Sequence, residues 1–152
     1  MNLAERVLAI AESQVGKKEN PLGSNWGEPV ASYLRSVGIN FPASWCMAFV
    51  YWCFDKAFFA VQQKNILVKT GGVLLAYNKI PSEYKSGVPK VGSIFIQDHG
   101  KGLGHTGIVT SFDTRFIYTI EGNTNDTGSR EGIEVCAKKR LRSTIKGYIN
   151  VV

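Results

Sequence analysis

The sequence predicts an α+β fold in which N-terminal helices pack on a C-terminal antiparallel β-sheet of about five strands. Apolar residues recur at helical spacing through the first half of the chain. After Pro81 and Pro89 the pattern changes to short runs of β-branched and aromatic residues. Because the helices precede the strands, we expect an antiparallel sheet rather than alternating strands and helices. The length of 152 residues, with 44% apolar residues, predicts a single domain over residues 1–152.

Two helices are expected before residue 40. The spacing of apolar residues over roughly 2–16 predicts the first, with Asn2 as its N-terminal cap. The segment "NPLGSNWG" at 20–27 is rich in Pro, Gly, Ser and Asn and is expected to be a loop. A second helix is predicted over 28–38, where four apolar residues share one face.

The stretch "PASWCMAFVYWCF" at 42–54 predicts a buried third helix. Counted from Cys46, apolar residues follow at i+3, i+4, i+7, i+8 and i+11, and aromatic residues widen this surface. A helix that is apolar on nearly all sides is a buried one. Ser44 is placed to cap this helix, which would put Cys46 in its first turn.

The remaining elements are short. A helix is expected over 73–80, after Gly71 and Gly72. Five segments have the residue types of strands, and they are 93–97, 105–112, 115–122, 132–140 and 146–152.

Charge and composition narrow the classes of partner. The formal net charge is +6, which favours polyanions only moderately. The basic cluster "KKRLR" at 138–142 is interpreted as a solvated face. Nucleic acid is not expected as a partner, because the aromatic residues lie on apolar faces and are not interleaved with Lys and Arg. We expect a monomer without an integral membrane segment, and no signal peptide is visible at the N-terminus.

The three cysteines do not form a disulfide or zinc framework. Their number is odd, and the sequence has no CxxC or HxxxH pair. Cys53 is expected to be a buried, inert thiol. For Cys136 the residue pattern does not decide on which face of its strand the side chain lies. A thiolate at a helix N-terminus is stabilised by the helix dipole and by backbone N–H groups, so Cys46 is a candidate nucleophile. Taken alone, however, a cysteine in this position is more often a small core residue.

A nucleophilic cysteine needs a base, and the chain contains two histidines. His99 lies in the glycine-rich "DHGKGLG" and is expected at the surface, whereas His105 opens a strand. A three-residue turn around Asp113 would place His105 directly opposite Glu121, with Asn123 further along the same face. A two-residue turn would shift the partners by one residue and turn Glu121 to the other face.

These residues resemble the CHAP domain, within the NlpC/P60-like, papain-like cysteine amidases and peptidases. Each motif is weak alone, but the ordered set is specific, and the resemblance covers roughly residues 2–152. The matching segments are "WCMAFVYW" around Cys46, "VGSIFI" at 91–96, "GHTGIV" around His105, "IEGNTN" around Glu121 and Asn123, and the closing "KGYINV".

The resemblance implies a papain-like fold and hydrolysis of amide bonds in peptidoglycan or muropeptides. The activity would be that of an endopeptidase or an N-acetylmuramoyl-L-alanine amidase acting on the bacterial cell wall, in the periplasm or outside the cell. Carried over by position, Cys46 is the nucleophile, His105 is the base, and Glu121 or Asn123 orients the histidine. A catalytically idle wall-binding module and an acyltransferase with the same residues are the alternatives.

The chain departs from the family pattern at Ser93 and in the loop before Cys46. The family often has Asp where this chain has Ser93, a position that we interpret as structural. The acidic calcium-binding loop of some members is absent, with Glu28 the one acidic residue in that segment, so no metal or other cofactor is expected. Asn25, Trp26 and Trp45 are candidate substrate contacts, although packing of this loop for structural reasons explains them equally well.

Overall fold

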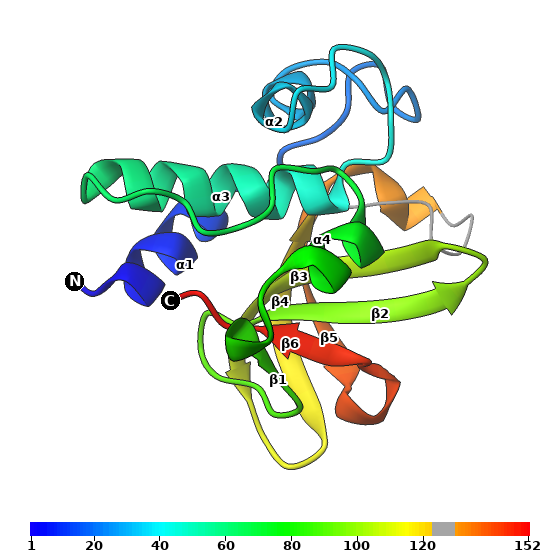
Figure 1. Cartoon of the computed structure of the whole chain (residues 1–152). Helices are drawn as coiled ribbons and strands as arrows, with labels where there is room; N and C mark the ends of the chain where they lie inside the picture. The colour runs from blue at the N-terminus through cyan, green and yellow to red at the C-terminus, as the bar shows by residue number, and fades with distance from the viewer. Residues whose placement is uncertain (123–129) are drawn as a thin grey trace.

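The computed structural model describes residues 1–122 and 130–152, and these residues form an α+β fold, as predicted. Four α-helices lie on one face of a six-stranded antiparallel sheet (Figure 1). The helices are α1 (Leu3–Gln14), α2 (Val30–Ser36), α3 (Cys46–Ala60) and α4 (Val73–Lys79). The strands are β1 (Lys85–Ser86), β2 (Ile94–Gly100), β3 (Leu103–Phe112), β4 (Phe116–Gly122), β5 (Val135–Leu141) and β6 (Gly147–Ile149). Short 3₁₀ turns span Ser82–Tyr84, Arg130–Ile133 and Arg142–Thr144.

The sheet has one more strand than the sequence predicts. Its order is β1-β6-β2-β3-β4-β5, so the last strand of the chain is inserted between β1 and β2. The additional strand, β1, contributes only Lys85 and Ser86, which pair with Ile149 and Tyr148. Two residues are too few to show an alternating pattern, which explains why the sequence does not reveal this strand.

The first helix begins as expected. The side chain of Asn2 accepts a hydrogen bond of 2.8 Å from the backbone N–H of Glu5. The carboxylate of Glu5 in turn accepts one of 3.0 Å from the N–H of Asn2. This reciprocal pair satisfies two backbone donors at the helix start and fixes where the chain enters α1.

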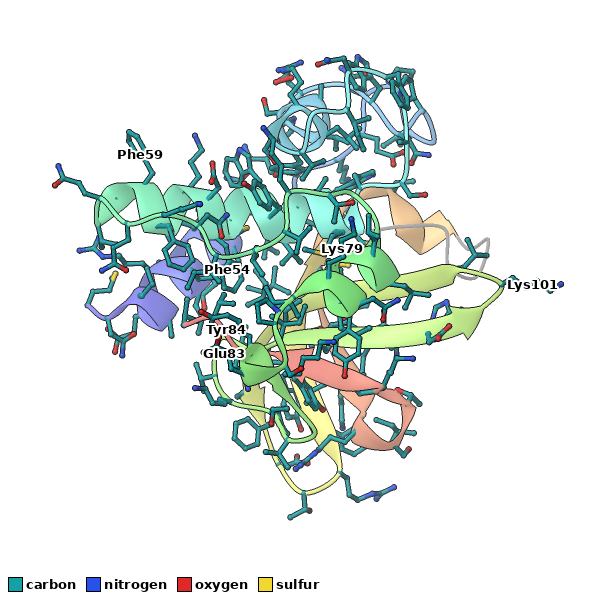
Figure 2. The ribbon with its side chains drawn as sticks, viewed as in Figure 1. Phe54, Phe59, Lys79, Glu83, Tyr84 and Lys101 are labelled. Carbon is teal, nitrogen blue, oxygen red and sulfur yellow. The ribbon has the colours of Figure 1, made fainter. Side chains whose placement is uncertain are left out.

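Helix α3 is buried along most of its length, as predicted, but its start differs in detail. The residue before its first turn is Trp45, not Ser44, and no side chain caps the helix. The prediction of a Ser44 cap was therefore wrong, while Cys46 does occupy the first turn. Phe54 points from α3 into the core, whereas Phe59 near its end is 83% exposed and points away from the molecule (Figure 2).

The sheet separates two apolar clusters. The larger cluster lies between the helices and the sheet and includes residues of all four helices. The smaller one covers the other face of the sheet with Phe95, Val109, Ile117 and Tyr148. Alternation along the strands places His105 and Glu121 on this second face, since both share it with Phe95 and Val109.

The register of the β3–β4 hairpin differs from the prediction. Val109 lies opposite Thr119, not Ile117, and by extension Gly107, not His105, lies opposite Glu121. The turn is the tighter two-residue type, closed by a hydrogen bond of 3.0 Å from the N–H of Asp113 to the carbonyl of Phe116.

A bulge in β3 offsets this tighter turn. Ser111 pairs with Tyr118 and Val109 pairs with Thr119, so Thr110 is an extra residue with no residue opposite it in the register of β4. Without that residue, the two-residue turn would direct Glu121 to the helical face of the sheet. The bulge at Thr110 therefore restores Glu121 to the face that carries His105.

Candidate active site

Cys46 and His105 come from different layers of the fold and meet. Cys46 is the first residue of α3, and its side chain is 4% exposed. His105 lies near the start of β3 and is 1% exposed. The two side chains are joined by a hydrogen bond. The structure thus brings together two of the residues that the sequence analysis singled out.

The imidazole of His105 is held on its other side by Glu121. The Nε2 atom of His105 donates a hydrogen bond of 2.7 Å to Oε1 of Glu121, and both side chains are buried. Because Nε2 is engaged by the carboxylate, Nδ1 is the nitrogen available to the sulfur of Cys46. The three side chains thus form a line of thiol, imidazole and carboxylate, which is the arrangement that a nucleophile, a base and an orienting group require.

Glu121 is itself held by two further side chains. Arg140 donates two hydrogen bonds to its carboxylate, from Nε to Oε2 at 2.7 Å and from the guanidinium NH₂ to Oε1 at 2.6 Å. The hydroxyl of Thr119 donates a third, of 2.6 Å, to Oε2. A bidentate contact of this kind fixes the plane of a carboxylate as well as its position. The orientation of His105 therefore depends on a network that extends to β5.

The electrostatics of the network favour a charged pair. Burial lowers the pKa of His105, but the hydrogen bonds and charges of Cys46 and Glu121 outweigh it and raise the pKa to about 9. Burial raises the pKa of Glu121, but Arg140 and His105 outweigh it and lower the pKa to about 2. At neutral pH His105 is accordingly a cation between two acidic groups.

Like Thr119, Arg140 is a residue of this site that sequence reasoning missed. Its cluster, "KKRLR", was interpreted as a solvated face, yet the Arg140 side chain is only 18% exposed and is engaged with Glu121. The alternation of residues along β5 could have indicated that Arg140 faces Glu121. Glu121 pairs with Cys136 across β4 and β5, and alternation places residue 140 on the same face as residue 136. Finding it required the β4–β5 register, which the sequence does not fix.

Two other predictions concern residues near this network. Asn123, the alternative orienting residue, lies outside the described residues. His99 is exposed, as expected, and its Nε2 lies 3.4 Å from Oε1 of Gln97.

The three candidate substrate contacts lie in different environments. Asn25 is partly buried with a φ of 55°, and Trp26 is partly buried against the main core. Trp45 is fully buried, and its indole N–H donates a hydrogen bond of 2.7 Å to Glu19. A direct contact between Trp45 and substrate would require this side chain to be uncovered, so the structure favours a supporting role for it.

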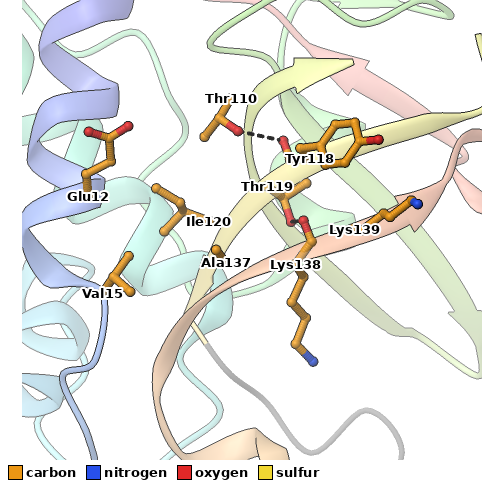
Figure 3. Close-up of a pocket in the computed structure, with 9 residues that line it drawn as sticks. All are labelled: Glu12, Val15, Thr110, Tyr118, Thr119, Ile120, Ala137, Lys138 and Lys139. Carbon is orange, nitrogen blue, oxygen red and sulfur yellow. Dashed lines mark hydrogen bonds between the residues drawn. The ribbon is translucent and has the colours of Figure 1, made fainter. Parts of the chain in front are cut away.

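Two surface hollows lie away from Cys46 and His105. The first, of about 550 Å³, lies between the end of α1 and strands β3 to β5. Figure 3 shows Glu12 and Val15 on one side of it and Ile120 and Ala137 on the other. The second, of about 490 Å³, lies between α2 and α3 and is lined by Trp52 and Phe59 among others. The first hollow is also lined by Thr119, whose hydroxyl donates to Glu121, but neither hollow is lined by Cys46, His105, Glu121 or Arg140.

The other thiols and acidic groups of the described residues form no second centre. Cys53 is a free, fully buried thiol whose pKa is raised by burial, and Cys136 is free and partly buried. Among residues 1–122 and 130–152, no group of three His, Cys, Asp or Glu side chains is arranged to hold a metal ion. Within the same ranges every helix is too short or too polar to span a bilayer.

Comparison with known proteins identifies the family. A model of the CHAP domain matches residues 38–123, which is more than half of the chain and includes Cys46, His105 and Glu121. The chain belongs to the CHAP domain family. CHAP domains are generally cysteine peptidases or amidases that act on peptidoglycan in the cell wall, and the family implies a papain-like fold.

A solved structure supports the fold independently. The crystal structure of Ly7917 matches with a TM-score of 0.56 at 15% sequence identity, and the match covers 97% of this chain. The chain corresponds to 62% of the length of that protein. At this identity the likeness concerns the fold alone. A search of curated proteins finds no match.

Proposed function

We propose that this CHAP domain hydrolyses amide bonds in the stem peptides of peptidoglycan through a thioester on Cys46. The activity would be that of an endopeptidase or an N-acetylmuramoyl-L-alanine amidase. The observation that carries the proposal is the line of hydrogen bonds from Cys46 through His105 to Glu121. A buried core cysteine does not need a histidine held in place by a carboxylate, whereas a nucleophile does.

The first half of the reaction forms the thioester. With the proton of Cys46 already held at Nδ1 of the cationic His105, the sulfur attacks the carbonyl carbon of the scissile amide. The carbonyl oxygen becomes an oxyanion, for which backbone N–H groups in the first turn of α3 are the proposed donors. When the C–N bond breaks, His105 gives its proton to the leaving amine. The acyl group then remains on Cys46.

The second half of the reaction restores the enzyme. The neutral imidazole of His105 takes a proton from water as the water oxygen attacks the thioester carbon. The C–S bond breaks, the carboxylic acid leaves, and the proton stays on His105 beside the sulfur, which restores the starting pair. Water is thus the acceptor in the proposed reaction, and an amine would replace it in an acyltransferase.

Glu121 and Arg140 act on His105 rather than on substrate. Glu121 fixes the Nδ1 side of the ring toward Cys46 and stabilises the imidazolium. The guanidinium of Arg140 keeps Glu121 ionised, so that the carboxylate does not take the proton that His105 must deliver.

The wider proposal concerns the chain as a whole. We place its action at the cell wall, in the periplasm or outside the cell, and we propose that residues 1–152 act as one monomeric domain. Asn25 and Trp26 remain candidate substrate contacts. For Trp45 we propose support of Cys46, because its side chain is fully buried.

Mass spectrometry of digested peptidoglycan tests this function. Purified cell walls incubated with the wild-type chain should release fragments with a new amino group and a new carboxyl group, and the position of these ends identifies the bond. A second incubation with an added amine separates the alternatives. Fragments that carry the amine in place of water would identify an acyltransferase, and binding to the walls without new ends would identify an idle module.

A further inference from the structure

Glu19 is a buried carboxylate that the proposed mechanism does not use. Its side chain is only 3% exposed, and none of the ion pairs formed by the described residues includes it. A buried carboxylate is costly unless each oxygen has a hydrogen-bond donor. Here Oε2 accepts a bond of 2.7 Å from the indole of Trp45, and Oε1 accepts one of 2.9 Å from the backbone N–H of Gly23.

The first of these bonds fixes the residue directly before the nucleophile. Trp45 precedes Cys46, and its carbonyl accepts the hydrogen bond of 2.9 Å from Phe49 that closes the first turn of α3. No side chain caps this turn. The position of Trp45 therefore sets where α3 begins.

The indole ring of Trp45 is also enclosed by neighbouring elements. It stacks on Tyr33 of α2, with the ring centroids 5.8 Å apart. On the sheet side it lies against Gly122, where an added Cβ would be 3.0 Å from Cε3 of the indole. Because the ring is fully buried between α2 and the end of β4, the Glu19 contact decides how its polar edge is directed.

The backbone of Glu19 is tied to the sheet that carries His105 and Glu121. Its N–H donates a hydrogen bond of 3.0 Å to the carbonyl of Ile133, and Lys18 forms an antiparallel bridge with Glu134. These residues lead directly into β5, which pairs with β4. Glu19 thus connects the sheet edge to the first residue of the catalytic helix.

We propose that Glu19 is a positioning residue for Cys46. It holds Trp45 so that the sulfur of Cys46 and the first-turn N–H groups of α3 stay aligned with His105. A displacement of about 1 Å at a reacting group can cost about a hundredfold in rate, so a loss of this contact is expected to act on catalysis. The inference rests on the proposed function, but the reactivity of Cys46 toward a small alkylating agent measures it without any hydrolysis.

The variants are chosen to separate an effect on the position of Cys46 from an effect on the stability of the fold. Glu19→Ala removes both hydrogen bonds, Glu19→Gln keeps one acceptor oxygen, and Trp45→Phe removes the indole donor. Ser93→Ala is the matched control, because Ser93, directly before β2, is buried and its hydroxyl makes two hydrogen bonds, with Lys90 and Asn150.

The experiment measures kcat and KM on a soluble muropeptide and the rate of alkylation of Cys46 by iodoacetamide across pH, followed by mass spectrometry of its peptide. Glu19→Ala should lower kcat and the neutral-pH alkylation rate at least about tenfold, with KM changed less than about twofold. Glu19→Gln should have an intermediate effect, and Ser93→Ala should lower the melting temperature without changing either rate.

Coupling between the two residues completes the test. If Glu19 acts through Trp45, the double variant Glu19→Gln with Trp45→Phe should lose no more activity than the worse single variant.

The proposal is overturned if the Glu19 variants lower only the melting temperature and keep the alkylation profile of the Ser93 control. If Glu19→Ala does not fold, Glu19→Gln decides. If the wild-type chain hydrolyses no muropeptide, the proposed function fails, and the alkylation rates still decide the role of Glu19.

Discussion

Gly107 on β3 and Glu121 on β4 share one space, because the side chain of Glu121 fills the volume that a side chain at position 107 would need. A Cβ atom added to Gly107 would lie 2.6 Å from Cγ of Glu121 and 2.7 Å from Cε2 of Phe95. The absent side chain is what allows Glu121 to lie across β3 and reach His105.

Gly107→Ala should therefore damage the site through Glu121. The new methyl group must displace Glu121 or Phe95, which we expect to cost about 1–3 kcal/mol of unfolding free energy and at least about tenfold in kcat. Gly87→Ala is the matched control, since an added Cβ there meets nothing within 4 Å. Denaturant unfolding and muropeptide kinetics measure both effects. Equal kcat values for the two alanine variants would show that Glu121 does not depend on the space at Gly107.

Arg140→Gln should weaken both stability and catalysis. The substitution leaves the buried carboxylate of Glu121 without its bidentate partner, which we expect to cost about 3 kcal/mol. The pKa of Glu121 should rise, and His105 should be oriented less firmly. Lys139→Gln removes the same charge from a neighbouring exposed position that contacts Phe116, not Glu121. If the two variants have the same kcat, the effect of Arg140 is one of net charge and not of the hydrogen bonds to Glu121.

Glu121→Ala and Asn123→Ala, compared in parallel, should separate the two orienting candidates. The hydrogen bond of 2.7 Å between His105 and Glu121 predicts that Glu121→Ala loses at least about a hundredfold in kcat. The loss in Asn123→Ala should be much smaller. The reverse order, with Asn123→Ala the more damaged variant, would assign the orienting role to Asn123.

The pKa of His105 predicts the pH dependence of activity. With this pKa at about 9, the value of kcat/KM should be sustained through neutral pH and fall as the imidazolium loses its proton near pH 9. Alkylation of Cys46 should persist above that pH, because it needs no proton donor. In Glu121→Gln the pKa of His105 should be lower, and the alkaline fall in kcat/KM should move to lower pH. An alkaline limit that stays in place in this variant would contradict the coupling of His105 to Glu121.

The same pKa values predict how stability depends on pH. The pKa of His105 lies above its ordinary value of 6.5, so its stabilisation, about 3 kcal/mol, is complete below pH 6.5 and lost as the pH rises through about 9. The pKa of Glu121 lies below its ordinary value of 4.5, so its stabilisation is complete above pH 4.5 and lost as the pH falls toward 2. Urea unfolding between pH 3 and pH 10 should show both losses, and His105→Ala should lack the alkaline one.

The sequence predicted the parts of the site that depend on local pattern. The apolar run after Cys46 predicted the buried helix, and the position of His105 at the start of a strand made it the candidate base. Glu121 was placed near His105 from the wrong register. The predicted pairing and the observed pairing differ by two residues, and a shift of two keeps the same face. The conclusion was therefore right although its derivation was not.

The remaining features depend on tertiary structure. The bulge at Thr110 has no residue pattern that distinguishes it from ordinary strand, because Thr is a common strand residue. Arg140 could be joined to Glu121 only once the β4–β5 register was known. Glu19 lies 26 residues before Trp45 in the chain, so no local spacing connects the two side chains.

The central claim is that the sulfur of Cys46 is the nucleophile, and the release of new amino groups from purified peptidoglycan tests it most directly. Wild type, Cys46→Ala and Cys46→Ser should be compared at equal concentration, with circular dichroism to verify that each is folded. We predict steady release by the wild-type chain and none above background by either folded variant. Release by folded Cys46→Ala at the wild-type rate would contradict the account.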